Sequence, residues 1–288
     1  QGDVDIAARA LKRGLASLSE QQRRPRPQIL VGVGYSMGAI ILSNYVARSG
    51  KHCSLDAAIS VSGGLDMRHQ LNFRRSMRLW QPMLTFGLRD DILIGKHILY
   101  SLIAYMFAYY LIRWLLTIAT SISSGKYARF YKNKLTRDQF LSMLRTTSVS
   151  ALDVEAIVTY NEFDDLVHYY SEMSAMGDRI PEFGLLQSSS NSSECVDDEW
   201  GRIGNISIPF AVLQALDDPL VGWRTLGTDR PQALVDSGNG NIMLLLTKAG
   251  GHVGWPLGMN PAKYSWKWMS DSVRDFTLAV DESMKNEG

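Results

Sequence analysis

Four short apolar runs stand out along the chain, and each is bounded by turn-forming residues. Runs of this length and composition predict β-strands. They lie near residues 28–34, 56–62, 208–215 and 240–247. Helix-like apolar spacing follows the first run and returns in the C-terminal tail, so strands and helices alternate at both ends of the chain. This alternation predicts an α/β protein with a parallel sheet.

The sequence between the second and third runs does not alternate in this way. From residue 65 to residue 204 its pattern is mostly helical. We therefore expect a large helical insertion, in the position of a lid, within a discontinuous core. The chain is thus divided into core residues 1–64, lid residues 65–204 and core residues 205–288.

The insertion contains an unusually apolar stretch, residues 98–122. Its first fifteen residues carry no charge, Arg113 interrupts it, and apolar residues continue to Ile122. A transmembrane helix needs about 20 apolar residues, and a central arginine costs about 2.5–3.5 kcal/mol on insertion. Three interpretations stay open: a buried cap helix, a helix lying in the membrane interface, and a true span. The basic residues that follow could face anionic headgroups or solvent; they are Lys126, Arg129, Lys132, Lys134 and Arg137.

The first predicted strand leads into the motif Gly34-Tyr35-Ser36-Met37-Gly38, directly before an apolar helix start. A G-x-S-x-G turn between a strand and a helix predicts a nucleophile elbow, in which a strained backbone lifts the serine hydroxyl above the sheet. Gly34 and Gly38 would meet the need of this tight turn for very small side chains. Ser36 is the candidate nucleophile. The backbone N–H of Met37, at the positive end of the helix dipole, is the candidate oxyanion donor.

An acid and a base follow the serine in order. Asp217 and Asp218 come directly after the third predicted strand, and His252 comes after the fourth. Serine, acid and histidine occur in this order in α/β-hydrolase triads. The carboxyl ends of parallel strands also form the edge where active sites of open α/β sheets lie. The pattern therefore predicts a triad of Ser36, an aspartate and His252, and it leaves both aspartates open as the acid.

Composition narrows the class of protein. The 288 residues are 45% hydrophobic with a net charge of +1, which suits a folded core and gives no electrostatic indication of nucleic-acid binding. Cys53 and Cys195 are too few for a disulfide framework. The five histidines form no ligand-spaced cluster, so neither a metal nor another cofactor is expected. No signal-peptide pattern is visible.

The beginning of the chain is short for a protein with this motif. Ser36 is preceded by one predicted helix, roughly residues 4–18, and a basic, proline-containing linker. A complete hydrolase sheet places about four or more strands before its elbow. We therefore expect the chain to be N-terminally truncated and to lack the loop that supplies the second oxyanion donor. An exposed sheet edge and a weakly active or inactive fragment are the expected consequences.

The sequence resembles the α/β-hydrolase 4 group, which includes the α/β-hydrolase-domain proteins 1, 2 and 3 with bacterial and yeast relatives. The resemblance extends over residues 29–276, and the apolar stretch 98–122 departs from it. The matching pieces are Val33–Ala39, Glu162-Phe163-Asp164-Asp165, Tyr169-Tyr170, Ser174, Asp217-Asp218-Pro219 and Gly250–Trp255. The resemblance implies an α/β-hydrolase fold, represented by the C-terminal half of its sheet. It also implies Asp218 as the acid, because the family places this residue two positions before a hydrophobic pair, with Asp217 as the fallback.

The resemblance further implies a serine carboxylic-ester hydrolase that works through an acyl-enzyme. Its substrates would be acylglycerols, phospholipids or short- to medium-chain esters. Many members carry an N-terminal membrane anchor, so a lipid substrate, a membrane surface and a membrane-associated location are expected. Two alternatives remain: an alcohol O-acyltransferase with the same triad, and a non-catalytic hydrolase-fold scaffold that binds a lipid or a partner protein.

Overall fold

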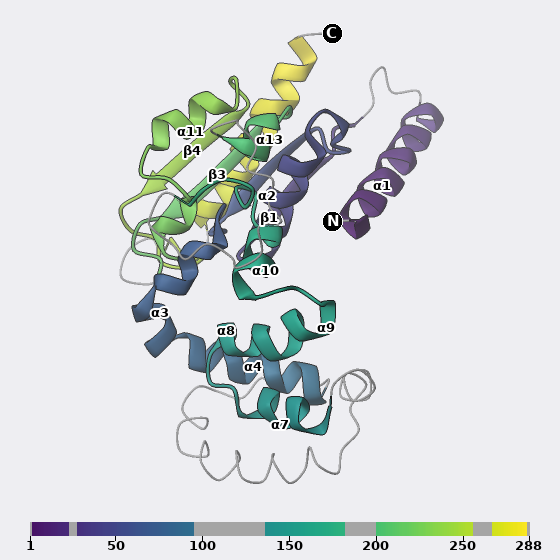
Figure 1. Cartoon of the computed structure of the whole chain (residues 1–288). Helices are drawn as coiled ribbons and strands as arrows, with labels where there is room; N and C mark the ends of the chain where they lie inside the picture. Colours follow the sequence, from purple (N-terminus) through teal and green to yellow (C-terminus); the bar gives the residue numbers. More distant parts are fainter. Residues whose placement is uncertain (1, 23–27, 95–135, 182–199, 256–266, 287–288) are drawn as a thin grey trace. The chain divides into compact units, whose positions relative to one another are not determined.

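A computed structural model of the chain describes residues 2–22, 28–94, 136–181, 200–255 and 267–286. The chain divides into two compact units (Figure 1). The first comprises residues 1–73 and 170–288 and contains the sheet, and the second comprises residues 74–169 and is helical where it is described. The apolar stretch 98–122 lies outside the described residues. Among the helices that are described, none combines the length and the apolar character needed to cross a membrane.

The sheet has four parallel strands in the order β1-β2-β3-β4. The strands are β1 (Val31–Tyr35), β2 (Ala57–Val61), β3 (Phe210–Ala215) and β4 (Ile242–Thr247). All four predicted strands and their parallel arrangement are confirmed. The register pairs Tyr35 with Val61 and Val61 with Leu213, so the carboxyl ends of β1 to β3 lie close together at one edge of the sheet.

The burial of the strands follows from their place in the sheet. Every residue of β2 and β3 is buried, whereas β1 and β4, the edge strands of the described sheet, are partly exposed. Central strands of a parallel sheet are covered on both faces, and for that reason their sequences are nearly continuous apolar runs. The sequences Ala-Ala-Ile-Ser-Val and Phe-Ala-Val-Leu-Gln-Ala fit this rule except for one serine and one glutamine.

Helices cover both faces of the sheet (Figure 1). On one face, α2 (Met37–Ser49) and α11 (Pro231–Ser237) pack in a core that includes Tyr45, Val46, Phe210, Val212 and Leu234. On the other face, α13 (Lys267–Asn286) closes a smaller core that includes Ile59, Val61, Leu213, Trp255 and Met269. The sheet is therefore the middle layer of three, which fixes its carboxyl edge between the two helical layers.

The N-terminal helix α1 (Gly2–Gln21) packs beside α2 and confirms the helix predicted over residues 4–18. Its Asp5 carboxylate accepts hydrogen bonds from the hydroxyls of Tyr45 (3.0 Å) and Ser54 (2.9 Å). The Lys12 ammonium forms a 2.7 Å ion pair with Asp56, which also accepts the Leu30 N–H at 2.8 Å. These contacts hold α1 to the entry of β1 and β2.

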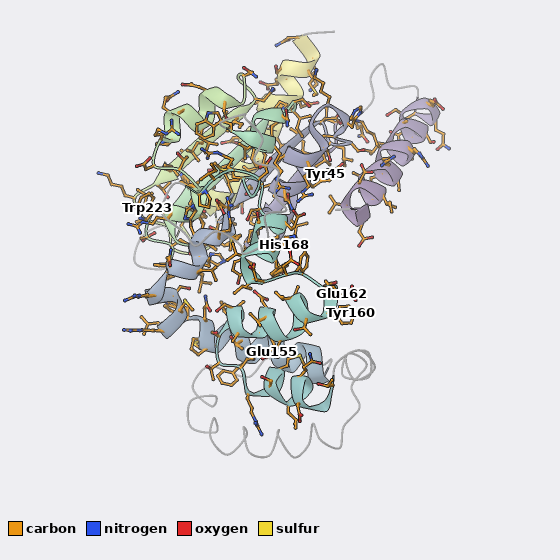
Figure 2. The ribbon with its side chains drawn as sticks, viewed as in Figure 1. Tyr45, Glu155, Tyr160, Glu162, His168 and Trp223 are labelled. Atoms are coloured by element: carbon orange, nitrogen blue, oxygen red, sulfur yellow. The ribbon has the colours of Figure 1, made fainter. Side chains whose placement is uncertain are left out.

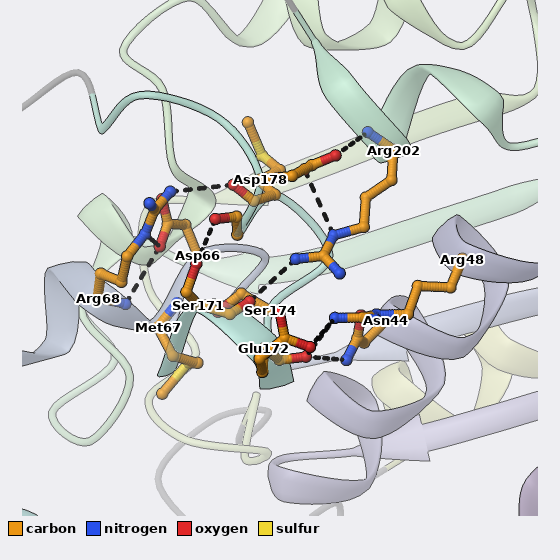
Figure 3. Close-up of polar contacts among 12 residues, drawn as sticks. Asn44, Arg48, Asp66, Met67, Arg68, Ser171, Glu172, Ser174, Asp178 and Arg202 are labelled. Atoms are coloured by element: carbon orange, nitrogen blue, oxygen red, sulfur yellow. Dashed lines mark hydrogen bonds and ion pairs between the residues drawn. The ribbon is translucent and has the colours of Figure 1, made fainter. Parts of the chain in front are cut away.

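Part of the predicted insertion belongs to the sheet unit. After β2 the chain forms the 3₁₀ helix η2 (Met67–Asn72), where buried Arg68 binds the Asp66 carboxylate through two hydrogen bonds of 2.8 and 2.7 Å. Arg68 also donates to the Met176 carbonyl at 3.0 Å, and the Ser174 hydroxyl accepts the Met67 N–H at 2.8 Å (Figure 3). The segments before and after the helical unit are thus tied to each other.

The segment that follows the helical unit, from Tyr170 onward, is also tied to α2. Glu172 forms a 2.6 Å ion pair with Arg48, and its carbonyl accepts the side-chain amide of Asn44 at 2.8 Å (Figure 3). Asp178 accepts the backbone N–H of Arg202 at 2.8 Å, in the 3₁₀ helix η4 (Gly201–Asn205). Residues 65–73 and the segment from Tyr170 onward therefore form part of the core, although their sequence pattern is helical.

The second unit is a group of short helices, as predicted for the insertion. They are α3 (Arg74–Leu79), α4 (Gln81–Ile94), α7 (Arg137–Arg145), α8 (Val149–Leu152), the π-helical η3 (Asp153–Val158) and α9 (Thr159–Asn161). Thr136 and Gln139 form a reciprocal capping box at the start of α7. The helix α10 (Leu166–Met173) begins in this unit and ends in the first. A role as a lid stays a prediction.

Candidate active site

Ser36 lies between the end of β1 and the start of α2, in the strained conformation predicted for an elbow. Its φ is +50° and its ψ is −120°. Residues in such sparsely populated regions cost about 1–3 kcal/mol and persist only where the surroundings hold them. The Ser36 N–H donates to the Val61 carbonyl at 2.9 Å, and the Ser36 carbonyl accepts the N–H groups of Ala39 (3.0 Å) and Ile40 (3.2 Å). Both sides of the strained residue are therefore fixed by the fold.

The close approach of β1, β2 and α2 explains two glycines near the elbow. A Cβ atom at Gly34 would lie 2.6 Å from the Gly38 carbonyl oxygen and 2.7 Å from the Ala39 Cα. A Cβ atom at Gly63, just after β2, would lie 2.4 Å from the Ala39 Cβ. At Gly38 no described heavy atom would lie within 4 Å of a Cβ. The steric prediction therefore holds for Gly34 but is wrong for Gly38, because the crowded side of the turn faces Gly34 and Gly63.

His252 links the serine and the acid. Its Nε2 lies 2.8 Å from the Ser36 Oγ, and its Nδ1 lies 2.9 Å from the Asp218 Oδ2. An ionised carboxylate can only accept, so Nδ1–H donates to Asp218 and Nε2 is left to accept the serine proton. The structure thus brings together three of the predicted site residues over 216 positions of sequence.

Asp218 is the aspartate that reaches His252. It is 2% exposed, and its Oδ1 accepts the N–H groups of Leu220 (2.8 Å) and Val221 (2.9 Å). The Gln214 amide lies 3.4 Å from its Oδ2. Asp217 instead accepts the Gly251 N–H at 2.9 Å. The buried carboxylate is therefore fully hydrogen-bonded, as a buried charge requires, and the choice of Asp218 implied by the family resemblance agrees with this geometry.

The turn that carries His252 is closed by its own residues. The Trp255 N–H donates to the Gly250 carbonyl at 2.7 Å, and the indole N–H donates to the Thr247 hydroxyl at 2.8 Å. A Cβ at Gly250 would lie 2.3 Å from the indole nitrogen, so the tryptophan packs directly on this glycine. The Gly-Gly-His-Val-Gly-Trp sequence is thereby explained as a compact turn that ends on a buried aromatic anchor.

Two polar contacts of the site were not predicted. The Ser62 Oγ accepts the N–H of Val253, the residue after His252, at 3.1 Å. The Gln214 amide contacts Asp218 from within β3. The available signal was the same in both cases: a polar residue at or near the end of an otherwise apolar, buried strand. Such a residue must find a buried partner, and here the partner lies in the site.

Met37 is the first residue of α2, and 55% of it is exposed. The first N–H groups of a helix have no acceptor within the helix, and they lie at the positive end of its dipole. The backbone N–H of Met37 thus has the chemical character of an anion donor next to Ser36. Within the described residues, no group of three or more histidine, cysteine or acidic side chains could hold a metal ion.

The other residues that carry the family resemblance support local structure. Glu162 ends α9 in the left-handed region, with φ of +60°, and the Asp165 carboxylate accepts the His168 N–H at 2.7 Å at the start of α10 (Figure 2 labels Glu162 and His168). Phe163 contacts the His168 ring edge-on. In the sheet unit, Ser174 donates to the Tyr170 carbonyl. These residues shape the helices around the insertion.

The parallel sheet, the strained elbow and the order of the site residues define an α/β-hydrolase fold with distant similarity to a lipase. The chain is 25% identical over 227 residues to a monoacylglycerol lipase of Saccharomyces cerevisiae. This alignment covers 77% of the chain and 37% of that protein, so the chain spans well under half of its relative's length. No protein-family model matches the chain.

The chain also shows similarity to two bacterial proteins of solved structure. An α/β fold family hydrolase from Bacillus anthracis strain Sterne is 11% identical, with 95% of this chain and 73% of that chain covered and a TM-score of 0.31. The rice cell wall degrading esterase LipA from Xanthomonas oryzae is 12% identical, with 92% and 61% covered and a TM-score of 0.35. The narrower resemblance to the α/β-hydrolase-domain proteins stays a prediction.

Proposed function

We propose that the protein is a serine carboxylic-ester hydrolase in which Ser36, His252 and Asp218 form the catalytic triad. The observation that carries this proposal is the continuous hydrogen-bonded chain from the Ser36 Oγ through His252 to the Asp218 Oδ2, with distances of 2.8 and 2.9 Å. A nucleophile within hydrogen-bond reach of a base, itself oriented by a third group, is the arrangement that activates a serine. The distant similarity to a lipase supports the same reaction class.

The proposed reaction proceeds in two halves. In the first, His252 Nε2 takes the Ser36 proton while Oγ attacks the ester carbonyl, and the leaving alcohol receives that proton when the acyl-enzyme forms. In the second, His252 takes a proton from water, the hydroxide attacks the acyl carbonyl, and Ser36 regains its proton as the acid leaves. Asp218 holds the imidazole tautomer and stabilises the imidazolium in both halves.

The oxyanion that forms in each half needs donors that are already in place. The backbone N–H of Met37 is the proposed donor, since it follows the nucleophile and begins α2. The α2 dipole adds to the favourable field at this point. Removing one donor of this kind costs roughly 10²–10³ in kcat in well-studied hydrolases.

A lipid ester is the proposed substrate. The similarity to a monoacylglycerol lipase supports an acylglycerol. The residues on either side of the nucleophile are apolar and exposed, Tyr35 by 41% and Met37 by 55%, which suits contact with an acyl chain. Acylglycerols partition into membranes, so a membrane surface as the place of action is part of the same proposal.

Active-site labelling tests the reaction class. The full-length protein should react with a fluorophosphonate probe and hydrolyse a p-nitrophenyl ester, whereas little or no labelling is expected of the isolated 288-residue chain. In the full-length protein, Ser36→Ala and His252→Ala should abolish both activities, because triad members act as a unit. A matched control is Ser60→Ala, which removes another buried serine of the same sheet. A wild-type protein that binds acylglycerol without labelling or turnover would instead be a lipid-binding scaffold.

Substrate choice and acyl acceptor require a second assay. A long-chain monoacylglycerol in vesicles and a short-chain ester should be compared, with vesicle flotation as the measure of membrane binding. Release of free fatty acid is expected. If the acyl group goes mainly to added alcohol at low alcohol concentration, the protein is an acyltransferase that uses the same triad.

A further inference from the structure

Ser62, the residue directly after β2, has an unusual backbone conformation. Its φ is +53°, and the residue is completely buried. A positive φ is uncommon for any residue other than glycine, and it costs about 1–3 kcal/mol. Because Tyr35 pairs with Val61 in the sheet register, Ser62 lies beside Ser36 at the carboxyl edge, and Ser36 has nearly the same φ. Two strained serines therefore directly follow two neighbouring strands.

The hydroxyl of Ser62 binds a second strained residue. Its Oγ accepts the Val253 N–H at 3.1 Å, and Val253 has a φ of +57°. A β-branched residue in this region is a genuine outlier, so the turn needs a contact that holds it. The N–H in question belongs to the peptide that joins His252 to Val253. The hydrogen bond therefore fixes the backbone directly after the proposed general base.

Ser62 itself is anchored on two sides. Its N–H donates to the Leu213 carbonyl of β3 at 2.9 Å. The next residue, Gly63, lies so close to α2 that an added Cβ would be 2.4 Å from the Ala39 Cβ. Ser62 and Ser36 are thus both held where the ends of β1 and β2 pack against α2. The Ser62 Oγ connects this part of the fold to the turn that carries His252.

We infer that Ser62 is a positioning residue for His252: it tethers the Val253 amide so that the imidazole Nε2 stays aimed at the Ser36 Oγ. The inference rests on the proposed function, because it assigns Ser62 a role through the general base. Without the tether, Val253 can relax toward negative φ, and the turn carries the ring with it. The distance of 2.8 Å between the His252 Nε2 and the Ser36 Oγ therefore depends on the positions of both Ser36 and Ser62.

Two substitutions separate the hydrogen bond from the backbone strain. Ser62→Ala removes the hydroxyl and keeps the strain, whereas Ser62→Gly removes the hydroxyl in a residue that accepts a positive φ. Both should lower kcat roughly 3- to 20-fold with little change in KM, since a small misplacement of a catalytic group slows the chemical step. Fluorophosphonate labelling should slow by a similar factor, with rates normalised to titrated active sites.

The matched control is Ser60→Ala. Ser60 lies in the same strand, is equally buried, and accepts a hydrogen bond from the Ser43 hydroxyl at 3.1 Å on the face that α2 covers. This variant should lose stability but keep kcat. Wild-type kcat in Ser62→Ala would overturn the inference, and so would full recovery in Ser62→Gly, which would assign the whole effect to strain.

A measurement without turnover decides the same point. In Ser62→Ala the Val253 amide should exchange its hydrogen faster, and the His252 ring resonances should shift or broaden in NMR spectra, whereas Ser60→Ala leaves both unchanged. Unchanged His252 signals in Ser62→Ala and Ser62→Gly overturn the inference whether or not the protein hydrolyses esters. If both variants alter the His252 signals but the wild-type protein never reacts with fluorophosphonate, the proposed function alone is overturned.

Discussion

Asp217 and Asp218 are neighbours in sequence, yet they hold different parts of the same turn. Asp218 is buried and binds the His252 imidazole, whereas Asp217 is exposed and accepts the Gly251 N–H at 2.9 Å. In the turn that follows β3, only Asp218 faces the ring. Asp217 stabilises the backbone from outside.

This division predicts unequal effects of two similar substitutions. Asp218→Asn should lower kcat by roughly 10³–10⁴, because an amide in this position favours the wrong imidazole tautomer. Asp217→Asn keeps an oxygen that can accept the Gly251 N–H, so its kcat should stay within about tenfold of wild type. Ester hydrolysis and probe labelling measure both. If Asp217→Asn lowered kcat more than Asp218→Asn does, the assignment of Asp218 as the catalytic acid would be wrong.

The glycines around the elbow should differ in their tolerance of alanine. Gly34→Ala and Gly63→Ala place a methyl group against the backbone or Cβ of α2, and each should cost about 1–3 kcal/mol or more in free energy of unfolding. Gly38→Ala meets open space among the described residues, and in a helix it should be neutral or stabilising by about 0.5–1 kcal/mol. Urea unfolding checks this order. A strongly destabilised Gly38→Ala protein would show that the crowded side of the turn is wrongly identified.

Gln214 should be sensitive to charge at its position. Its side-chain amide faces three acceptors: the Val221 carbonyl (3.2 Å), the Asp218 carboxylate (3.4 Å) and the Ala215 carbonyl (3.4 Å). Gln214→Met removes the donors at similar volume and should cost about 1–2 kcal/mol. Gln214→Glu adds a second buried carboxylate beside Asp218 and should cost more, with partial recovery in acid as the pair shares a proton. Unfolding at pH 5 and pH 8 tests the order, and equal stability of the two variants would contradict it.

The Cys53 thiol should react slowly. Burial, the largest effect, raises its pKa, although hydrogen bonds from Leu55 and Tyr45 act in the opposite direction. Since the thiolate is the reactive form, alkylation followed by peptide mass mapping should reach half its maximal rate at a higher pH in the folded chain than in the same chain in urea. The thiol's contribution to stability is present below the pKa of the unfolded chain and is lost as pH rises through the raised pKa. A lower midpoint in the folded chain would contradict this expectation.

The sequence was sufficient to predict the strands, the elbow and the candidate nucleophile and base, because each of them is encoded in a short contiguous stretch. The apolar run before Gly34 and the helix after it define the elbow locally. The order of Asp218 and His252 after their strands then indicates a shared edge, since parallel strands bring their carboxyl ends together.

Contacts between distant residues were beyond the reach of local patterns. Ser62 and Val253 are 191 positions apart, and nothing near either residue specifies the other. The same applies to Arg48 and Glu172, whose ion pair assigns a helical stretch of the predicted insertion to the core. The expected truncation and the role of residues 98–122 stay predictions, and the latter lie outside the described residues.

The division of the chain into two units places all three members of the proposed triad in the same unit. Ser36, Asp218 and His252 all belong to the first unit, and residues 74–169 form the second without supplying a member of the triad. The hydrogen-bonded chain from Ser36 to Asp218 is therefore formed entirely within the first unit. In the gene, the codons for the proposed triad therefore lie in the two stretches that flank the stretch encoding the helical unit.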